Sequence, residues 1–300
     1  MSGAEVRDLF VSSMDGLKIY ARDQGPLASA ALPVVCLPGL ARSSADFHSL
    51  AGALAGDEAR PRRVLSIDYR GRGRSEWDRD WQRYDVRVEL EDVLQVLTAA
   101  GIEEAVFVGT SRGGLIAMGL GALRPGLLRG AVLNDIGPVI ERQGLVRIRS
   151  YVGKVPTPRD FRHGAEILRQ ISGAQFPAWT DAEWDLLARG TWTDRESGLV
   201  LAYDPKLMNA LATTDPEAPI PELWPLFEGL KHVPVLVLRG EHSDILSAET
   251  LGRMQGAHSR LEALTVAGQG HAPLLEGGLV GRIMRFVLET ELSGGLHPTA

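Results

Sequence analysis

A serine set between two glycines is the residue whose surroundings most clearly suggest chemistry. Ser111 is the centre of Gly109-Thr110-Ser111-Arg112-Gly113, which follows a short apolar run and precedes a helical pattern. A turn of this kind is so tight that the serine backbone is strained and a Cβ at either glycine would collide with neighbouring backbone. The hydroxyl would then project at a helix N-terminus, where the dipole favours negative charge. We predict that Ser111 is a nucleophile; a serine that only caps the helix is the alternative.

A serine hydroxyl is a weak nucleophile and needs a base. The chain has seven histidines, and His271 stands in Gly270-His271-Ala272-Pro273, between the last apolar run and the last helical pattern. That loop is expected at the same edge of a sheet as the Ser111 turn. We predict that His271 is the base and interpret the other six as surface or helix-end residues. Among those six, His48 is the next candidate for the base.

The base in turn needs a carboxylate to fix its tautomer and to stabilise the imidazolium. Asp244 follows the apolar run Val233–Leu238, whereas Asp135 follows an earlier run. The order Ser111, Asp244, His271 is one of the known nucleophile–acid–base orders. The sequence therefore favours Asp244 by position and keeps Asp135 as the alternative acid.

Short apolar runs alternate with helical patterns along most of the chain. The runs expected as strands are Val6–Ser13, Leu17–Asp23, Pro33–Leu37, Val64–Tyr69, Ala105–Val108, Gly130–Leu133, Val233–Leu238 and Leu261–Val266. The segments expected as helices include Asp85–Ala100, Leu115–Leu123 and Val280–Leu288. Strands that are apolar on both faces belong to covered parallel sheets, so the pattern predicts an α/β fold with a doubly wound, mostly parallel sheet. Asp15-Gly16 predicts a hairpin and hence an antiparallel N-terminal edge.

The region from residue 137 to residue 221 interrupts this alternation. It contains no convincing strand pattern, and Thr180-x-x-Glu183 is typical of a helix start. We interpret residues 137–221 as an all-helical cap inserted into a core made of residues 1–136 and 222–292. The tail, residues 293–300, is expected to be loose.

Composition excludes several classes of protein. Of 300 residues, 44% are hydrophobic and 23% charged, which is the balance of a globular chain. The net charge of −6 and the lack of a basic tract argue against nucleic acid. No apolar run is long enough for a membrane span, no secretory signal is visible, and the single Cys36 cannot form an internal disulfide. We expect a cytoplasmic protein with no metal and no cofactor; its oligomeric state is left open.

Motifs spread along the chain together resemble those of a known family. They are Leu37-Pro38-Gly39-Leu40, Asp68-Tyr69-Arg70-Gly71-Arg72-Gly73-Arg74-Ser75, Gly109–Gly113, Asp204-Pro205, Asp244 and Gly270-His271. In these segments the chain is similar to α/β-hydrolases of the capped serine esterase type, and the likeness covers nearly all of it. The resemblance implies an oxyanion hole formed by the backbone N–H groups of Leu40 and Arg112. Pro38 stands where the family usually has histidine.

Two side-chain positions follow from these interpretations. The Arg112 cation would lie at a helix N-terminus, where the dipole disfavours it, so we expect Arg112 to pair with an acid, with Asp135 as the candidate. In the cap, Trp179, Trp184 and Trp192 could line an apolar acyl pocket, although a small cap also needs such residues for its own core.

The predicted activity is hydrolysis of carboxylic esters of small, largely apolar substrates through an acyl-enzyme. A serine at the elbow argues against haloalkane dehalogenases and epoxide hydrolases, which resemble this fold but place aspartate there. Carbon–carbon bond hydrolases, lactonases and perhydrolases use the same three residue types and stay open as alternatives. A receptor-like binding module with slow hydrolysis is the alternative from another class.

Overall fold

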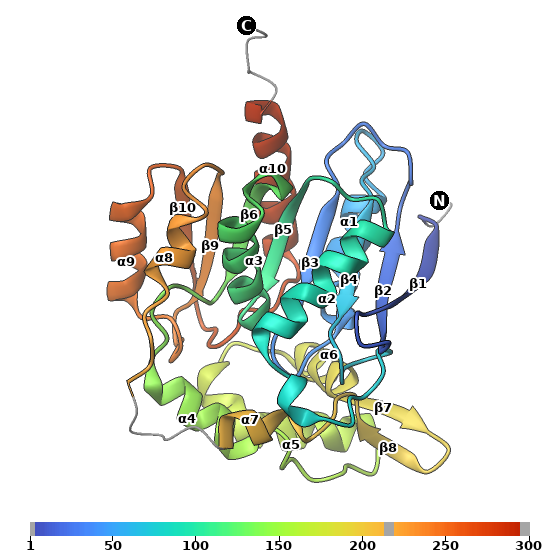
Figure 1. Cartoon of the computed structure of the whole chain (residues 1–300). Coiled ribbons are helices and arrows are strands. Elements are labelled where there is room, and N and C mark those ends of the chain that lie inside the picture. Colours follow the sequence, from blue (N-terminus) through green and yellow to red (C-terminus); the bar gives the residue numbers. More distant parts are fainter. Residues whose placement is uncertain (1–3, 213–218, 295–300) are drawn as a thin grey trace, which may run out of the picture.

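A mostly parallel sheet forms the centre of the molecule (Figure 1). The computed structural model describes residues 4–212 and 219–294. The strands are β1 (Val6–Ser12), β2 (Lys18–Gln24), β3 (Val34–Leu37), β4 (Val64–Asp68), β5 (Ala105–Thr110), β6 (Leu128–Asn134), β9 (Val235–Gly240) and β10 (Leu261–Val266). They lie in the order β1-β2-β4-β3-β5-β6-β9-β10, with β1 and β2 antiparallel to their neighbours and the rest parallel.

Helices cover both faces of this sheet. These helices are α1 (His48–Ala55), α2 (Val86–Ala99), α3 (Arg112–Leu123), α8 (Trp224–Glu228), α9 (Ala248–Ala257) and α10 (Gly278–Gly294), with short 3-10 turns at Ser44–Phe47, Trp81–Arg83 and Pro125–Leu127. Alternate residues of β3 divide between the two faces: Val35 joins the core under α2, α3, α8 and α9, whereas Val34 and Cys36 join the core under α1 and α10. The predicted doubly wound α/β fold and the antiparallel N-terminal hairpin are confirmed.

After β6 the chain forms a cap, which runs from α4 to α7 and lies beyond the end of the sheet at which β5 gives way to α3 (Figure 1). The cap contains α4 (Arg142–Tyr151), α5 (Phe161–Ser172), a 3-10 turn at Gly173–Gln175, α6 (Asp181–Thr191) and α7 (Leu207–Ala212), and α8 follows it before β9. It also contains a two-stranded antiparallel hairpin, β7 (Trp192–Arg195) and β8 (Gly198–Leu201), so the prediction of an all-helical cap is wrong. Each of these strands has four residues, too few for alternation to stand out from a loop.

The last helix, α10, runs to Gly294, so residues 293–294 are helical rather than part of the expected loose tail. Residues 295–300 of that tail lie outside the described part of the chain.

Among residues 4–212 and 219–294, no helix has the length and apolar character needed to cross a bilayer.

Candidate active site

Ser111 occupies a strained turn between β5 and α3. Its backbone has φ 51° and ψ −111°, a conformation that costs an L-residue energy and is kept where the surroundings enforce it. A Cβ at Gly113 would lie 2.0 Å from the Leu37 carbonyl oxygen, and one at Gly109 would lie 2.5 Å from the Gly113 carbonyl carbon. These neighbours are backbone atoms that cannot move aside, so both glycines are required for the predicted turn to form.

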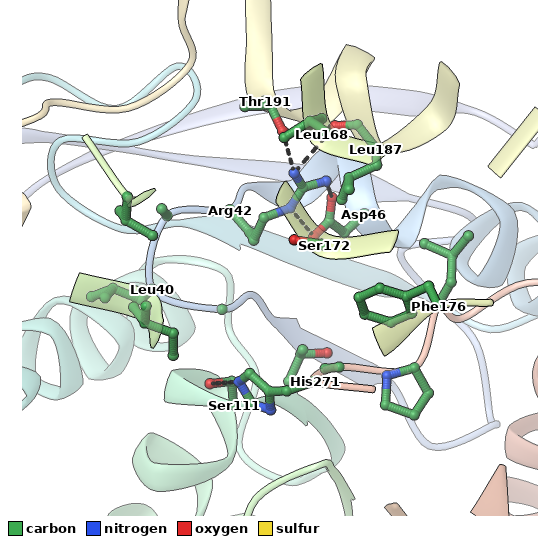
Figure 2. A pocket seen from close by; sticks show the side chains of 18 of the residues that line it. Leu40, Arg42, Asp46, Ser111, Leu168, Ser172, Phe176, Leu187, Thr191 and His271 are labelled. Carbon is green, nitrogen blue, oxygen red and sulfur yellow. Dashed lines mark hydrogen bonds and ion pairs between the residues drawn. The ribbon is translucent and has the colours of Figure 1, made fainter. Parts of the chain in front are cut away.

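His271 links Ser111 to a buried carboxylate. Its Nε2 lies 2.9 Å from Ser111 Oγ, and its Nδ1 lies 2.8 Å from Asp135 Oδ2 (Figure 2 shows the Ser111–His271 bond). The His271 side chain is 8% exposed and that of Asp135 is fully buried. A hydroxyl, an imidazole and a carboxylate joined in this order can move the hydroxyl proton to the ring while the carboxylate stabilises the resulting charge.

Asp135 is held firmly in the position from which it contacts His271. It follows β6 with φ 59°, a left-handed conformation that turns its side chain away from the strand direction. The Gly240 N–H donates to Oδ1 at 2.7 Å, and the Ser243 hydroxyl donates to Oδ2 at 2.6 Å. These donors stabilise the ionised carboxylate and leave it oriented toward the imidazole.

Asp244 does not contact His271, which corrects the expectation drawn from its position. Both of its oxygens bind Arg147 of α4, with Nε–Oδ2 at 2.6 Å and Nη2–Oδ1 at 2.9 Å. Burial acts to raise the pKa of Asp244, but the hydrogen bond and charge of Arg147 outweigh burial and hold that pKa below its usual value. A carboxylate engaged with a guanidinium in this way ties α4 to the end of β9 instead of orienting the imidazole.

The two predicted oxyanion donors belong to peptides whose carbonyls are fixed. The Gly39 carbonyl accepts from the Arg42 N–H at 3.2 Å, and the Ser111 carbonyl accepts from the Gly114 N–H at 2.9 Å. In a trans peptide the N–H points opposite to the carbonyl, so these bonds fix the directions of the Leu40 and Arg112 N–H groups. Arg112 is the first residue of α3, where a backbone N–H has no partner within the helix.

The Arg112 side chain does not pair with Asp135, and that prediction is wrong. Its Nε lies 2.5 Å from Glu89 Oε2, and its Nη2 donates to the Tyr84 carbonyl at 3.0 Å. Glu89 is a fully buried residue in the first turn of α2, and nothing in its sequence position distinguished it from other helical carboxylates.

A cavity of about 170 Å³ opens above Ser111 between the sheet end and the cap. Its wall is mainly apolar and includes Ile148, Trp179, Pro273 and Leu274. Figure 2 shows four further apolar residues of the wall, Leu40, Leu168, Phe176 and Leu187. Of the three tryptophans expected here, only Trp179 lines the cavity. Trp184 and Trp192 are 2% and 1% exposed and pack in the cap's own core.

Arg42 lies in the same wall and was not singled out from the sequence. Its Nε donates to Asp46 Oδ2 at 2.8 Å, and its Nη1 donates to Thr191 Oγ1 at 2.9 Å (Figure 2). The Arg42 side chain therefore joins the loop after β3 to the end of α6 in the cap. Nothing in the sequence around an arginine in a loop predicts a contact with a residue so far away along the chain.

The chain is similar to known hydrolases over most of its length. The family model described as "Alpha/beta hydrolase family" matches residues 34–280. A 3-hydroxybutyrate-oligomer hydrolase of Cupriavidus necator is 36% identical over 250 residues, which is 80% of this chain and 82% of the relative. A solved alpha/beta hydrolase of Novosphingobium aromaticivorans is 38% identical with a TM-score of 0.88, over 96% of this chain and 99% of that one. The chain belongs to the alpha/beta hydrolase family.

Proposed function

We propose that the protein is a serine hydrolase that cleaves carboxylic esters through an acyl-enzyme. The observation that carries the proposal is the bridge that His271 forms between the Ser111 hydroxyl and the buried Asp135 carboxylate. Ser111 serves as nucleophile, His271 as general base and then general acid, and Asp135 as the acid that orients the imidazole. Asp135 takes the role that the sequence had favoured for Asp244.

The reaction proceeds in two acyl-transfer steps. His271 Nε2 takes the Ser111 proton as Oγ attacks the ester carbonyl, and the Leu40 and Arg112 N–H groups stabilise the resulting oxyanion. The intermediate collapses when His271 protonates the leaving alcohol, which leaves the acyl group on Ser111. Water then attacks the acyl-enzyme with His271 again as base, and the acid is released.

The size of the cavity supports short acyl groups. Its volume of about 170 Å³ is close to that of an apolar cavity that binds a benzene molecule. The similarity to a 3-hydroxybutyrate-oligomer hydrolase, whose name describes an ester of a short hydroxy acid, supports the same class. We therefore propose esters with short acyl chains as substrates.

Labelling with a fluorophosphonate tests the proposed nucleophile. The probe should modify one residue of the wild-type protein, and mass mapping of the peptides should identify it as Ser111. Activity on p-nitrophenyl butyrate should be lost in proportion to labelling. A fully labelled protein that retains its esterase activity, or a label on another residue, would refute the proposal.

Substitution of Trp179 by phenylalanine should change the preference for acyl length. Trp179 lines the cavity and stacks on Phe176 with ring centres 4.1 Å apart, so a smaller ring makes room for a longer chain. Across p-nitrophenyl esters from acetate to decanoate, the optimum of kcat/KM should move to longer chains, with a gain of about 4-fold for each added methylene that the pocket buries. Trp192→Phe, which makes the same exchange at a buried residue of the cap core that does not line the cavity, is the matched control. If both variants keep the wild-type profile, Trp179 does not limit the acyl site.

A further inference from the structure

Three charged side chains that the proposed reaction does not use lie together behind the active-site turn. Glu89 of α2 and Arg72 of the turn after β4 are fully buried, and the Arg112 side chain is 16% exposed. Glu89 Oε1 lies 2.6 Å from Arg72 Nη1, and Glu89 Oε2 lies 2.5 Å from Arg112 Nε. One carboxylate thus joins two guanidinium groups from separate segments of the chain.

Arg72 connects this carboxylate to the loop that carries Leu40. Its Nε donates to the Leu40 carbonyl at 2.8 Å, and its Nη1 donates to the Arg70 carbonyl at 2.6 Å. Its guanidinium carbon lies 5.7 Å from the ring centre of Tyr69 and 5.6 Å from that of Tyr84, within the range of a cation–π contact. The Leu40 carbonyl is therefore held by a guanidinium that is itself restrained on several sides.

Arg112 connects the same carboxylate to the start of α3. Besides the Glu89 contact, its Nη2 donates to the Tyr84 carbonyl at 3.0 Å. The backbone N–H of Arg112 is the second proposed oxyanion donor. The side chain thus restrains the very residue whose N–H must face the reacting carbonyl.

Burying three charged groups is costly, and a buried ion pair often stabilises a protein no more than apolar residues of similar volume do. Stability alone is therefore a weak reason for this cluster. Instead, Arg72 binds the loop that carries Leu40, and Arg112 is the first residue of α3, so the cluster contacts both segments that carry a proposed oxyanion donor. A displacement of about 1 Å in an active site can lower the rate about 100-fold.

We propose that Glu89 is a positioning residue for the oxyanion hole, which acts by holding Arg72 and Arg112 and through them the two donor segments. The inference rests on the proposed acyl-transfer reaction, because only that reaction develops an oxyanion between Leu40 and Arg112. Glu89 touches neither substrate nor reacting atoms.

The test compares Glu89→Gln with Glu91→Gln, which changes an exposed carboxylate of the same helix. The concentration of active sites is first measured from the endpoint of fluorophosphonate labelling. Steady-state kinetics on p-nitrophenyl butyrate then give kcat per active site and KM. A trifluoromethyl ketone supplies the third readout, since Ser111 Oγ adds to its carbonyl carbon, His271 takes the proton, and the carbonyl oxygen becomes an oxyanion in the hole.

In Glu89→Gln, kcat per active site should fall about 10- to 100-fold while KM changes less than about threefold. The affinity for the trifluoromethyl ketone should fall by a factor similar to that of kcat. Glu91→Gln should match the wild type in every measurement. If Glu89→Gln does not fold, Arg112→Met, which keeps an unbranched apolar stem but cannot bind the carboxylate, should give the same pattern.

Three results would overturn the inference while leaving the proposed function intact. The first is a Glu89→Gln variant whose kcat per active site and affinity for the ketone equal those of the wild type. The second is a reduced fraction of labelled sites with unchanged kcat per site, which is the result of a purely structural role. The third is a lower kcat with undiminished ketone affinity. By contrast, a wild-type protein that the fluorophosphonate does not label at Ser111 would remove the proposed function and the inference with it.

Discussion

Replacement of Asp135 by asparagine is expected to lower kcat for p-nitrophenyl butyrate by about 10³- to 10⁴-fold. Asparagine can keep its oxygen on the Gly240 N–H, which places its NH₂ group toward His271 Nδ1. That group can only donate, so the imidazole must carry its proton on Nε2. An Nε2 that holds a proton cannot accept the Ser111 proton, and the hydroxyl loses its base. Steady-state kinetics on protein whose folding has been checked by thermal unfolding measure the effect.

Asp244→Asn is the matched control, because it changes the same chemical group at the position that the sequence favoured. It removes a charge that binds two of the three guanidinium nitrogens of Arg147, Nε and Nη2, so the unfolding temperature should fall. Its kcat should stay within about 10-fold of wild type, since His271 keeps its tautomer through Asp135. The opposite ranking, with Asp244→Asn nearly inactive and Asp135→Asn active, would assign the catalytic acid to Asp244.

Ser111→Ala should lower turnover of the same ester at least ~10³-fold, because the acyl-enzyme cannot form without the hydroxyl. The double variant Ser111→Ala/His271→Ala should be hardly slower than Ser111→Ala alone, since the two side chains act as one unit. Alanine should also relieve none of the turn's strain, so the unfolding temperature should stay near that of the wild type. Steady-state kinetics measure the loss of turnover, and thermal unfolding measures the stability of the variant.

Ser150→Ala, at an exposed serine of α4, provides the control for loss of a hydroxyl. It should retain full turnover and full fluorophosphonate labelling. Turnover by Ser111→Ala within 10-fold of the wild type would contradict a serine acyl-enzyme, as would a double variant whose losses simply multiply.

Local patterns in the sequence were sufficient for most of the fold. The strands β3, β5, β6 and β9 are buried on both faces, which is why their sequences are continuous apolar runs, and the short length of these runs distinguishes them from helices. The turn at Ser111 could also be recognised, because Gly109 and Gly113 are demanded by contacts with nearby backbone. The hairpin of β7 and β8 was missed because strands of four residues carry too little alternation.

The choice of the carboxylate on His271 could not be made from the sequence. Asp135 and Asp244 both follow buried strands, and chain position alone ranks them wrongly for this contact. Their difference lies in partners far away along the chain: Gly240 and Ser243 aim Asp135 at the imidazole, while Arg147 of the cap occupies Asp244.

The sequence by itself determined the strands of the sheet, the helices on both faces and the strained turn under Ser111, because each is signalled by a pattern of residue types within one short segment of the chain. Only the tertiary structure decided that Asp135 contacts His271, that Glu89 joins Arg72 to Arg112, and that Trp179 alone of three cap tryptophans reaches the cavity. The physical reason is that electrostatic pairing and packing are set by which side chains meet in space, and several carboxylates and aromatic rings were equally suitable until the chain had folded.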